Sequence, residues 1–225
     1  MPQLIAMIIV VVGAMIYMFQ TFGGTGDKIE GVAQKGSIIT EINNIKDGIK
    51  IAARSEQIAT TASGDRVNNL QGLAKLSYFA EQINNQLTDS NNKQANVYNA
   101  ISFGGGVITE ATLANTKGNM EISLVSNRAG MIPGIFVDFS KGTLGTNKAF
   151  LESQIANDLS AVAYIDRHAT AASSPATGVQ NSSGTDLEKR TPAYSTEVTT
   201  AGSETISDGK FIIYFKDFGS NEVVK

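Results

Sequence analysis

The 225-residue chain contains no cysteine and no tryptophan, and it has a single histidine, His168. The lack of cysteine excludes disulfides, thiolate metal sites and thiol nucleophiles, so an exported form of the protein must be stabilised by packing alone. One histidine also excludes any site that needs two imidazoles. We therefore expect no metal site and no cofactor, and we interpret His168 as a surface or structural residue.

Charge is missing from one part of the chain. Residues 1–26 include no Asp, Glu, Lys, Arg or His, although the whole chain has a net charge of −3 and a pI near 5.2. The lack of a basic excess argues against nucleic acid as a partner, although a local basic patch is compatible with this average. The length accommodates one modest domain with an appendage but not two full domains.

The charge-free segment is almost continuously apolar from Leu4 to Phe19. As a helix that rises about 1.5 Å per residue, it nearly crosses a hydrocarbon core of about 30 Å. A cleaved signal peptide would have a basic start and a small-residue cleavage site, and this segment has neither. Two interpretations stay open: a permanent membrane anchor for an outward-facing domain, and a helix that leaves the membrane to form the core of a filament.

A glycine-rich joint follows the apolar segment at Gly23, Gly24 and Gly26. Each glycine weakens a helix interior by about 1 kcal/mol relative to alanine, so the chain should loosen there and allow the helix to kink between membrane and filament states. Asp27 and Glu30 then form a capping-box-like start for a second helix.

The second helix is predicted over residues 27–54. Its apolar residues recur in steps of four and three along one face: Ile38, Ile42, Ile45, Ile49 and Ala52. This spacing is typical of an amphipathic helix, and we expect the apolar stripe to pack on its own domain. Residues 1–55 thus form a stalk with a hydrophobic part (1–22), the joint (23–26) and an amphipathic part (27–55).

Residues 56–225 are predicted to form a small head domain. Apolar residues have helical spacing from Val67 to Leu87, with Gly72 as a weak point, and an Asn- and Gln-rich loop continues to residue 96. Strands are predicted at 107–109, 120–126, 135–139 and 210–218, and the last of them is expected to close the sheet. The order of elements indicates an α+β fold with an antiparallel sheet.

Two further segments of the head are distinctive. A helix is predicted to open at Thr146, with four apolar residues on one face: Leu151, Ile155, Leu159 and Val162. Residues 169–208 are rich in Ser, Thr, Ala and Gly, which predicts an exposed polar excursion rather than core. Within it, Asn181 begins a triplet, Asn181-Ser182-Ser183, that fits an N-glycosylation acceptor.

No arrangement of residues predicts an enzyme. The triplet Gly104-Gly105-Gly106 lacks the Lys-Ser or Lys-Thr that a phosphate-binding loop requires, so we interpret it as a turn. The pattern Ser90-x-x-Lys93 lies in a polar loop without a supporting motif. Carboxylates such as Asp138 and Glu152 are scattered, and we interpret them as part of an ordinary solvated surface.

Together these features resemble type IV pilins, and the head is most similar to the type IVb branch. The similarity of the N-terminal part lies in the start at Met1, the Leu4-Ile5 pair and the long aliphatic run. In the head it extends from Phe103-Gly104-Gly105 through the strand 135–139 to the helix 146–162. The positions that the resemblance implies for the filament core are Met1, Gln3, Leu4, Ile5, Ala6, Ile8, Ile9, Val12, Gly13, Ile16 and Phe19.

The resemblance implies a structural subunit that polymerises with copies of itself into an extracellular filament at the cell surface. Before assembly such a subunit is held in the inner membrane, where it meets the pilus assembly machinery. A minor pilin or a pseudopilin of a secretion system remains an alternative, as does a membrane-anchored extracytoplasmic domain that does not polymerise.

Two departures from the family pattern matter. Family members carry a glutamate shortly after the first hydrophobic residues, where this chain has Ile5 or Ala6. Because a buried, unpaired ammonium is costly, we hypothesise that the amide oxygen of Gln3 accepts a hydrogen bond from a terminal amine instead; normal assembly of a Gln3→Leu variant would contradict this. The cysteine pair that commonly staples the C-terminal part of the head is also missing, so subunit contacts or the final strand must replace it.

Overall fold

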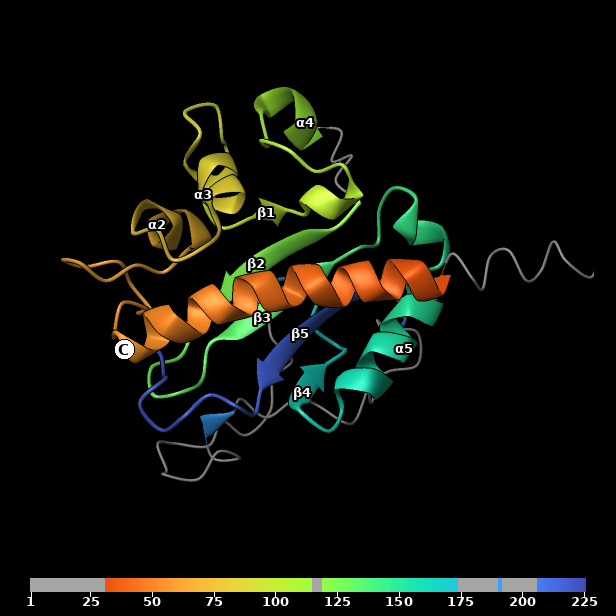
Figure 1. Cartoon of the computed structure of the whole chain (residues 1–225). Coiled ribbons are helices and arrows are strands. Elements are labelled where there is room, and N and C mark those ends of the chain that lie inside the picture. Colours follow the sequence, from red (N-terminus) through yellow and green to blue (C-terminus); the bar gives the residue numbers. More distant parts are fainter. Residues whose placement is uncertain (1–30, 115–118, 174–189, 192–205) are drawn as a thin grey trace, which may run out of the picture.

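The computed structural model describes residues 31–114, 119–173, 190–191 and 206–225. A 24-residue helix over residues 31–54, called the long helix below, packs on a five-stranded antiparallel sheet, which confirms the predicted α+β class. Figure 1 shows the long helix in orange, lying across the strands, with α2 and α3 near β1 and with α5 near β4. The helix ends at Arg54, as the apolar periodicity predicts, and its predicted start at residues 27–30 lies outside the described residues.

The sheet has the strand order β1-β2-β3-β5-β4, and every neighbouring pair is antiparallel. Its strands are β1 (Tyr98–Asn99), β2 (Glu121–Val125), β3 (Gly134–Asp138), β4 (Ala163–Asp166) and β5 (Lys210–Phe215). The C-terminal strand β5 lies inside the sheet, between β3 and β4, with Ile213 paired both to Ile135 and to Ile165. The C-terminal part of the chain therefore lies within the sheet rather than at its edge and completes the core.

The predicted strands are correct where apolar residues run through both faces of the sheet. The predicted strands 120–126 and 135–139 correspond to β2 and β3 within one residue at each end. The final strand ends at Phe215 rather than at residue 218, because the chain turns there and presents Asp217 to the long helix. The strand predicted at 107–109 is wrong: those residues lead into α4 (Glu110–Ala114). The strands β1 and β4 were not predicted, since each is too short to show a clear alternation.

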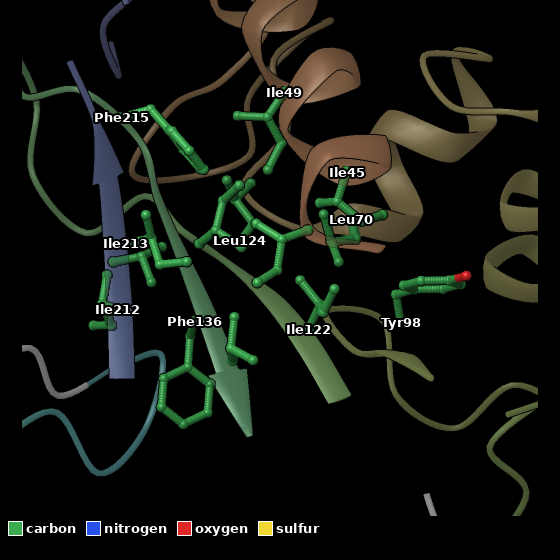
Figure 2. Packing of buried hydrophobic residues seen from close by; sticks show 14 of the residues in the cluster. Ile45, Ile49, Leu70, Tyr98, Ile122, Leu124, Phe136, Ile212, Ile213 and Phe215 are labelled. Atoms are coloured by element: carbon green, nitrogen blue, oxygen red, sulfur yellow. The ribbon is translucent and has the colours of Figure 1, made fainter. Parts of the chain in front are cut away.

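The core lies between the long helix and one face of the sheet. All five residues of the apolar stripe, Ile38 to Ala52, are fully buried, which confirms that the helix packs on its own domain. Figure 2 shows Ile45 and Ile49 directed at the strands, where Leu124 and Ile122 meet them. On the opposite face of the sheet, the paired residues Phe136 and Ile212 are also buried, so both faces of the sheet are covered.

The helical run predicted from Val67 to Leu87 is split into α2 (Leu70–Lys75) and α3 (Glu81–Thr88). Asn69 caps α2 by accepting a hydrogen bond from the backbone N–H of Gly72 at 2.8 Å, and Ser77 reverses the chain with a φ of 61°. This break lets the Tyr78-Phe79 segment approach the long helix at Gly48. A side-chain carbon at Gly48 would lie only 2.4 Å from the ring of Phe79, so the approach requires glycine.

The helix predicted from Thr146 is α5 (Lys148–Leu159), preceded by a 3₁₀ turn, Leu144–Thr146. Its apolar face is confirmed for Leu151, Ile155 and Leu159, which are buried. Val162 does not continue that face; it is 50% exposed because the helix has already ended before β4 begins. A second 3₁₀ turn, Ile101–Phe103, follows β1.

Candidate assembly surface

The side of the long helix that faces away from the sheet forms a second regular stripe. Its members, which we call the outer face, recur in steps of four and three residues and are all exposed: Val32, Gly36, Thr40, Asn43, Asp47 and Ile51. At 100° per residue this stripe lies opposite the buried isoleucines. Val32 and Ile51 are large apolar residues with exposed fractions of 61% and 58%, and nothing lies within 4 Å of a side-chain carbon placed at Gly36.

The outer face was not identified from the sequence, although the spacing of the apolar residues contains the information needed to find it. It lies opposite the isoleucine stripe and has the same periodicity, so the position of one stripe on the helix determines the position of the other. Short side chains in its middle let a second helix approach closely. Among its members only Asp47 carries a charge, which makes the outer face a nearly neutral surface along a helix about 36 Å long.

The first turns of the long helix are fixed to α5. The Lys35 ammonium forms an ion pair with Asp158 at 2.6 Å. One turn earlier, Gly31 lies against the ring of Phe150, where a side-chain carbon would come within 3.0 Å of the ring. The glycine at this position therefore lets the helix lie closely against α5.

The middle of the long helix is fixed by a buried carboxylate. Glu41 is 2% exposed; its Oε2 accepts a hydrogen bond from the Tyr98 hydroxyl at 2.8 Å, and its Oε1 accepts one from the Ser102 N–H at 2.7 Å. Burial, together with the nearby Glu41 carboxylate, raises the pKa of Tyr98 well above its ordinary value. Glu41 thereby joins the helix to β1 and to the 3₁₀ turn that follows it.

The last turns of the long helix bind the C-terminal segment of the chain. Lys46 and Lys50 both pair with Asp217 at 2.9 Å. One turn further on, Arg54 donates from Nε to Glu222 at 2.9 Å, while the second oxygen of Glu222 accepts from the Gly219 N–H at 2.6 Å. We call these five ion-paired residues, which span the end of the helix and the end of the chain, the C-terminal clamp.

A residue of the predicted polar excursion also holds the C-terminal segment. Arg190 is 5% exposed and donates from Nη1 to the carbonyl of Gly219 at 2.5 Å, while its own carbonyl accepts from the Ile132 N–H at 3.0 Å. Ala169 and Thr191 are buried as well, so the prediction of an exposed excursion over 169–208 is wrong at these positions. Hydrogen bonds and ion pairs hold the C-terminal segment in a chain that has no cysteine.

The clamp should weaken in acid. Burial alone would raise the pKa of Asp217, but hydrogen bonds from Lys46 and Lys50 and their positive charges outweigh it and hold that pKa below its ordinary value. A lowered carboxyl pKa stabilises the fold above the unfolded-state value of about 3.9, and this stabilisation is lost as pH falls through the folded-state pKa.

We therefore expect Asp217→Asn to be less stable than the parent protein at pH 7, by no more than about 1 kcal/mol because the pair is partly exposed to solvent. The difference should shrink as pH falls from about 3.9 through the lowered folded-state pKa of Asp217. Thermal unfolding of both proteins as a function of pH measures it. A difference that persists unchanged in acid would contradict this account.

Several residues singled out in the sequence lie outside the described residues. They are the filament-core positions Met1 to Phe19, the joint at Gly23, Gly24 and Gly26, and the glycosylation triplet at Asn181. Their roles remain predictions. Gly104, with a φ of 74°, forms the turn that was expected in place of a phosphate loop. Glu152 corrects the sequence interpretation: it is fully buried and ion-paired to Arg167, not solvated.

Within the described ranges, no group of His, Cys, Asp and Glu residues is arranged to hold a metal ion. No helix in the same part of the chain is both long and apolar enough to span a membrane. Comparisons of the sequence and structure with protein-family models, curated proteins and solved structures found no match.

Proposed function

We propose that the chain is a structural subunit that polymerises into an extracellular filament of the type IV pilus kind. The observation that supports this most is the two-sided long helix, which is fixed to its head along one face and exposed along the other. The charge-free residues 1–26 precede it in the sequence, separated from residue 31 by the four residues 27–30. In this proposal residues 1–22 and the outer face form the centre of the filament, and the sheet and α5 lie outside.

Assembly would bury the apolar N-terminal residues against the same residues of neighbouring copies. Full burial of a Leu- or Ile-sized side chain contributes about 1.5–3 kcal/mol relative to water. Residues that start in a bilayer are already out of water, so this transfer does not by itself extract the subunit. The proposal therefore includes an ATP-driven assembly machine in the inner membrane, as the resemblance to pilins implies.

The attachment of the long helix to the head suits a subunit that carries tension. The attachments are the ion pair to α5 near the start of the helix, the buried Glu41 near its middle and the C-terminal clamp near its end. A force along the helix is thereby distributed over several separate contacts with the head. The proposal assigns the protein no catalytic activity and no cofactor, and its partners are further copies of the same chain.

A bulky residue on the outer face should block assembly without unfolding the head. We expect Asn43→Trp to reduce the yield of sheared filaments by about tenfold or more, because a misfit of about 1.4 kcal/mol per contact already changes an equilibrium tenfold. The matched control is Asn85→Trp, the same change at an exposed position of α3. Electron microscopy of the sheared fraction gives the yield, and circular dichroism checks the fold. Equal yields from the two variants would contradict a buried outer face.

A further inference from the structure

A shallow groove on the head lies mainly between three segments. It is lined by Gln94, Asn96 and Val97 before β1, by the end of β2 with the residues after it, and by residues 171–173, with Thr60 and Asn68 beside them. All of its polar lining residues carry carboxamides or hydroxyls, among them Asn68, Gln94, Ser123, Ser126 and Asn127, and none of its lining residues is charged. The groove is far in sequence from the apolar segment on which the proposed function depends.

One wall of the groove is fixed by the side chain of Asn96, whose amide makes hydrogen bonds to β2 like those of a neighbouring strand. Oδ1 of Asn96 accepts hydrogen bonds from the N–H groups of Leu70 and Leu124 at 3.1 and 3.2 Å, and its Nδ2 donates to the Leu124 carbonyl at 2.9 Å. The amide thus continues the ladder of β2 beyond β1 and links it to the start of α2. This wall is rigid before any ligand arrives.

Other polar side chains of the groove have bonding capacity to spare. Ser123 is 6% exposed, and within the described residues its hydroxyl makes no hydrogen bond. The carboxamides of Gln94 and Asn127 likewise bond to no other described residue. A hydroxyl and two carboxamides together offer both donors and acceptors at one site.

The chemistry of the lining defines the class of ligand. Phosphate and carboxylate ligands call for Arg or Lys, while amines and metal ions call for carboxylates, and the groove has neither. A neutral sugar both donates and accepts hydrogen bonds through many uncharged hydroxyl groups, which matches this lining. The small apolar side chains of Val97, Ala171 and Ala172 provide a surface for its C–H face. We propose that this groove binds a neutral saccharide.

Saturation-transfer NMR on the full chain in a detergent without a sugar headgroup tests the proposal. The probes are maltotriose, cellotriose and triacetylchitotriose, which present two glucan linkages and an N-acetyl sugar, with 3′-sialyllactose as the charged comparison. We expect at least one neutral trisaccharide to bind with a Kd of about 1 mM and to bind more tightly than 3′-sialyllactose. Gln94→Ala and Asn127→Ala should each weaken this binding about 3- to 10-fold, in line with the loss of one hydrogen bond.

The control is Asn91→Ala. It matches Asn127→Ala, because it also removes the carboxamide of an exposed asparagine, but Asn91 does not line the groove and its loss should leave binding unchanged. Three outcomes would overturn the proposal: no neutral trisaccharide binds at about 10 mM, the sialylated probe binds more tightly, or both groove variants bind as the parent does. Because the measurement uses unassembled protein, its failure leaves the filament proposal untouched, and a failure of assembly leaves this one untouched.

Discussion

Ile45→Ala should lower the free energy of unfolding by about 2–5 kcal/mol, the range found when a fully buried aliphatic side chain is truncated to alanine. Ile45 is fully buried at the centre of the stripe, and Figure 2 shows it close to Leu70 of α2, on the side of the long helix that faces the sheet. The truncation removes core contacts and leaves a cavity that the surrounding residues fill only in part. Chemical unfolding of the full chain in detergent, followed by circular dichroism, measures the loss.

The same helix supplies the control for this prediction. Ile51→Ala removes the same atoms from the outer face, where the side chain is 58% exposed. Its effect on stability should be within about 0.5 kcal/mol, since little packing is lost and alanine favours the helix. Losses of equal size at the two positions would mean that the helix does not lie on the sheet as described.

Glu152→Ala should be about as damaging, with an expected loss of about 3–5 kcal/mol, because it removes a fully buried carboxylate together with its three hydrogen bonds, each of which contributes about 1–3 kcal/mol. Oε1 of Glu152 accepts hydrogen bonds from Arg167 Nε at 2.7 Å and from the Ser207 N–H at 2.9 Å, and Oε2 accepts from the Gly209 N–H at 2.9 Å. Ser207 and Gly209 have φ values of 74° and 85°, so the carboxylate holds a tightly turned loop at the start of β5.

Two variants separate the charge of Glu152 from its volume. Glu152→Gln keeps the shape of the side chain but replaces one acceptor oxygen with a donor, so its loss of stability should fall between those of the parent and the alanine variant. Gln154→Ala lies on the same helix, its side chain has no hydrogen bond within the described residues, and it should change stability by less than about 0.5 kcal/mol. A Glu152→Ala loss no larger than that of Gln154→Ala would contradict the structural role of this carboxylate.

Features that repeat along the chain could be predicted from the sequence. The isoleucine stripe of the long helix and the apolar strands β2, β3 and β5 follow from local periodicity, which depends on neighbours a few residues away. The split between α2 and α3 could not be predicted this way. It depends on Ser77 adopting a positive φ and on Gly48 admitting Phe79, and these two positions meet only in the folded chain.

The buried carboxylates show a second limit of sequence interpretation. Glu152 was interpreted as a solvated residue, because charged side chains are seldom fully buried, and nothing in the sequence singles out Glu41. Their partners lie far away in the chain, at Tyr98 and at residues 207–209. The network that holds the C-terminal segment is likewise invisible locally, since Arg54 and Glu222 are 168 residues apart. Long-range polar networks of this kind form only in the folded chain and produce no periodic pattern in the sequence.

For the candidate assembly surface, the sequence predicted the apolar N-terminal positions but not the outer face. The positions 1–22 stand out because they lack charge, which composition alone reveals. The outer face is a mixture of Val, Gly, Thr, Asn, Asp and Ile, so only the placement of the opposite stripe identifies it. The two surfaces follow one another in the sequence, with residues 23–31 between them, and the filament proposal joins them into one interface.

The most direct test is cryo-electron microscopy of material sheared from cells that express the full chain. The proposal predicts helical filaments in which the apolar segments of many copies pack together at the axis and the outer face of each long helix turns toward them. Finding the protein only as single copies in membranes or detergent, with no filament in the sheared fraction, would contradict the proposal and leave an anchored domain in its place.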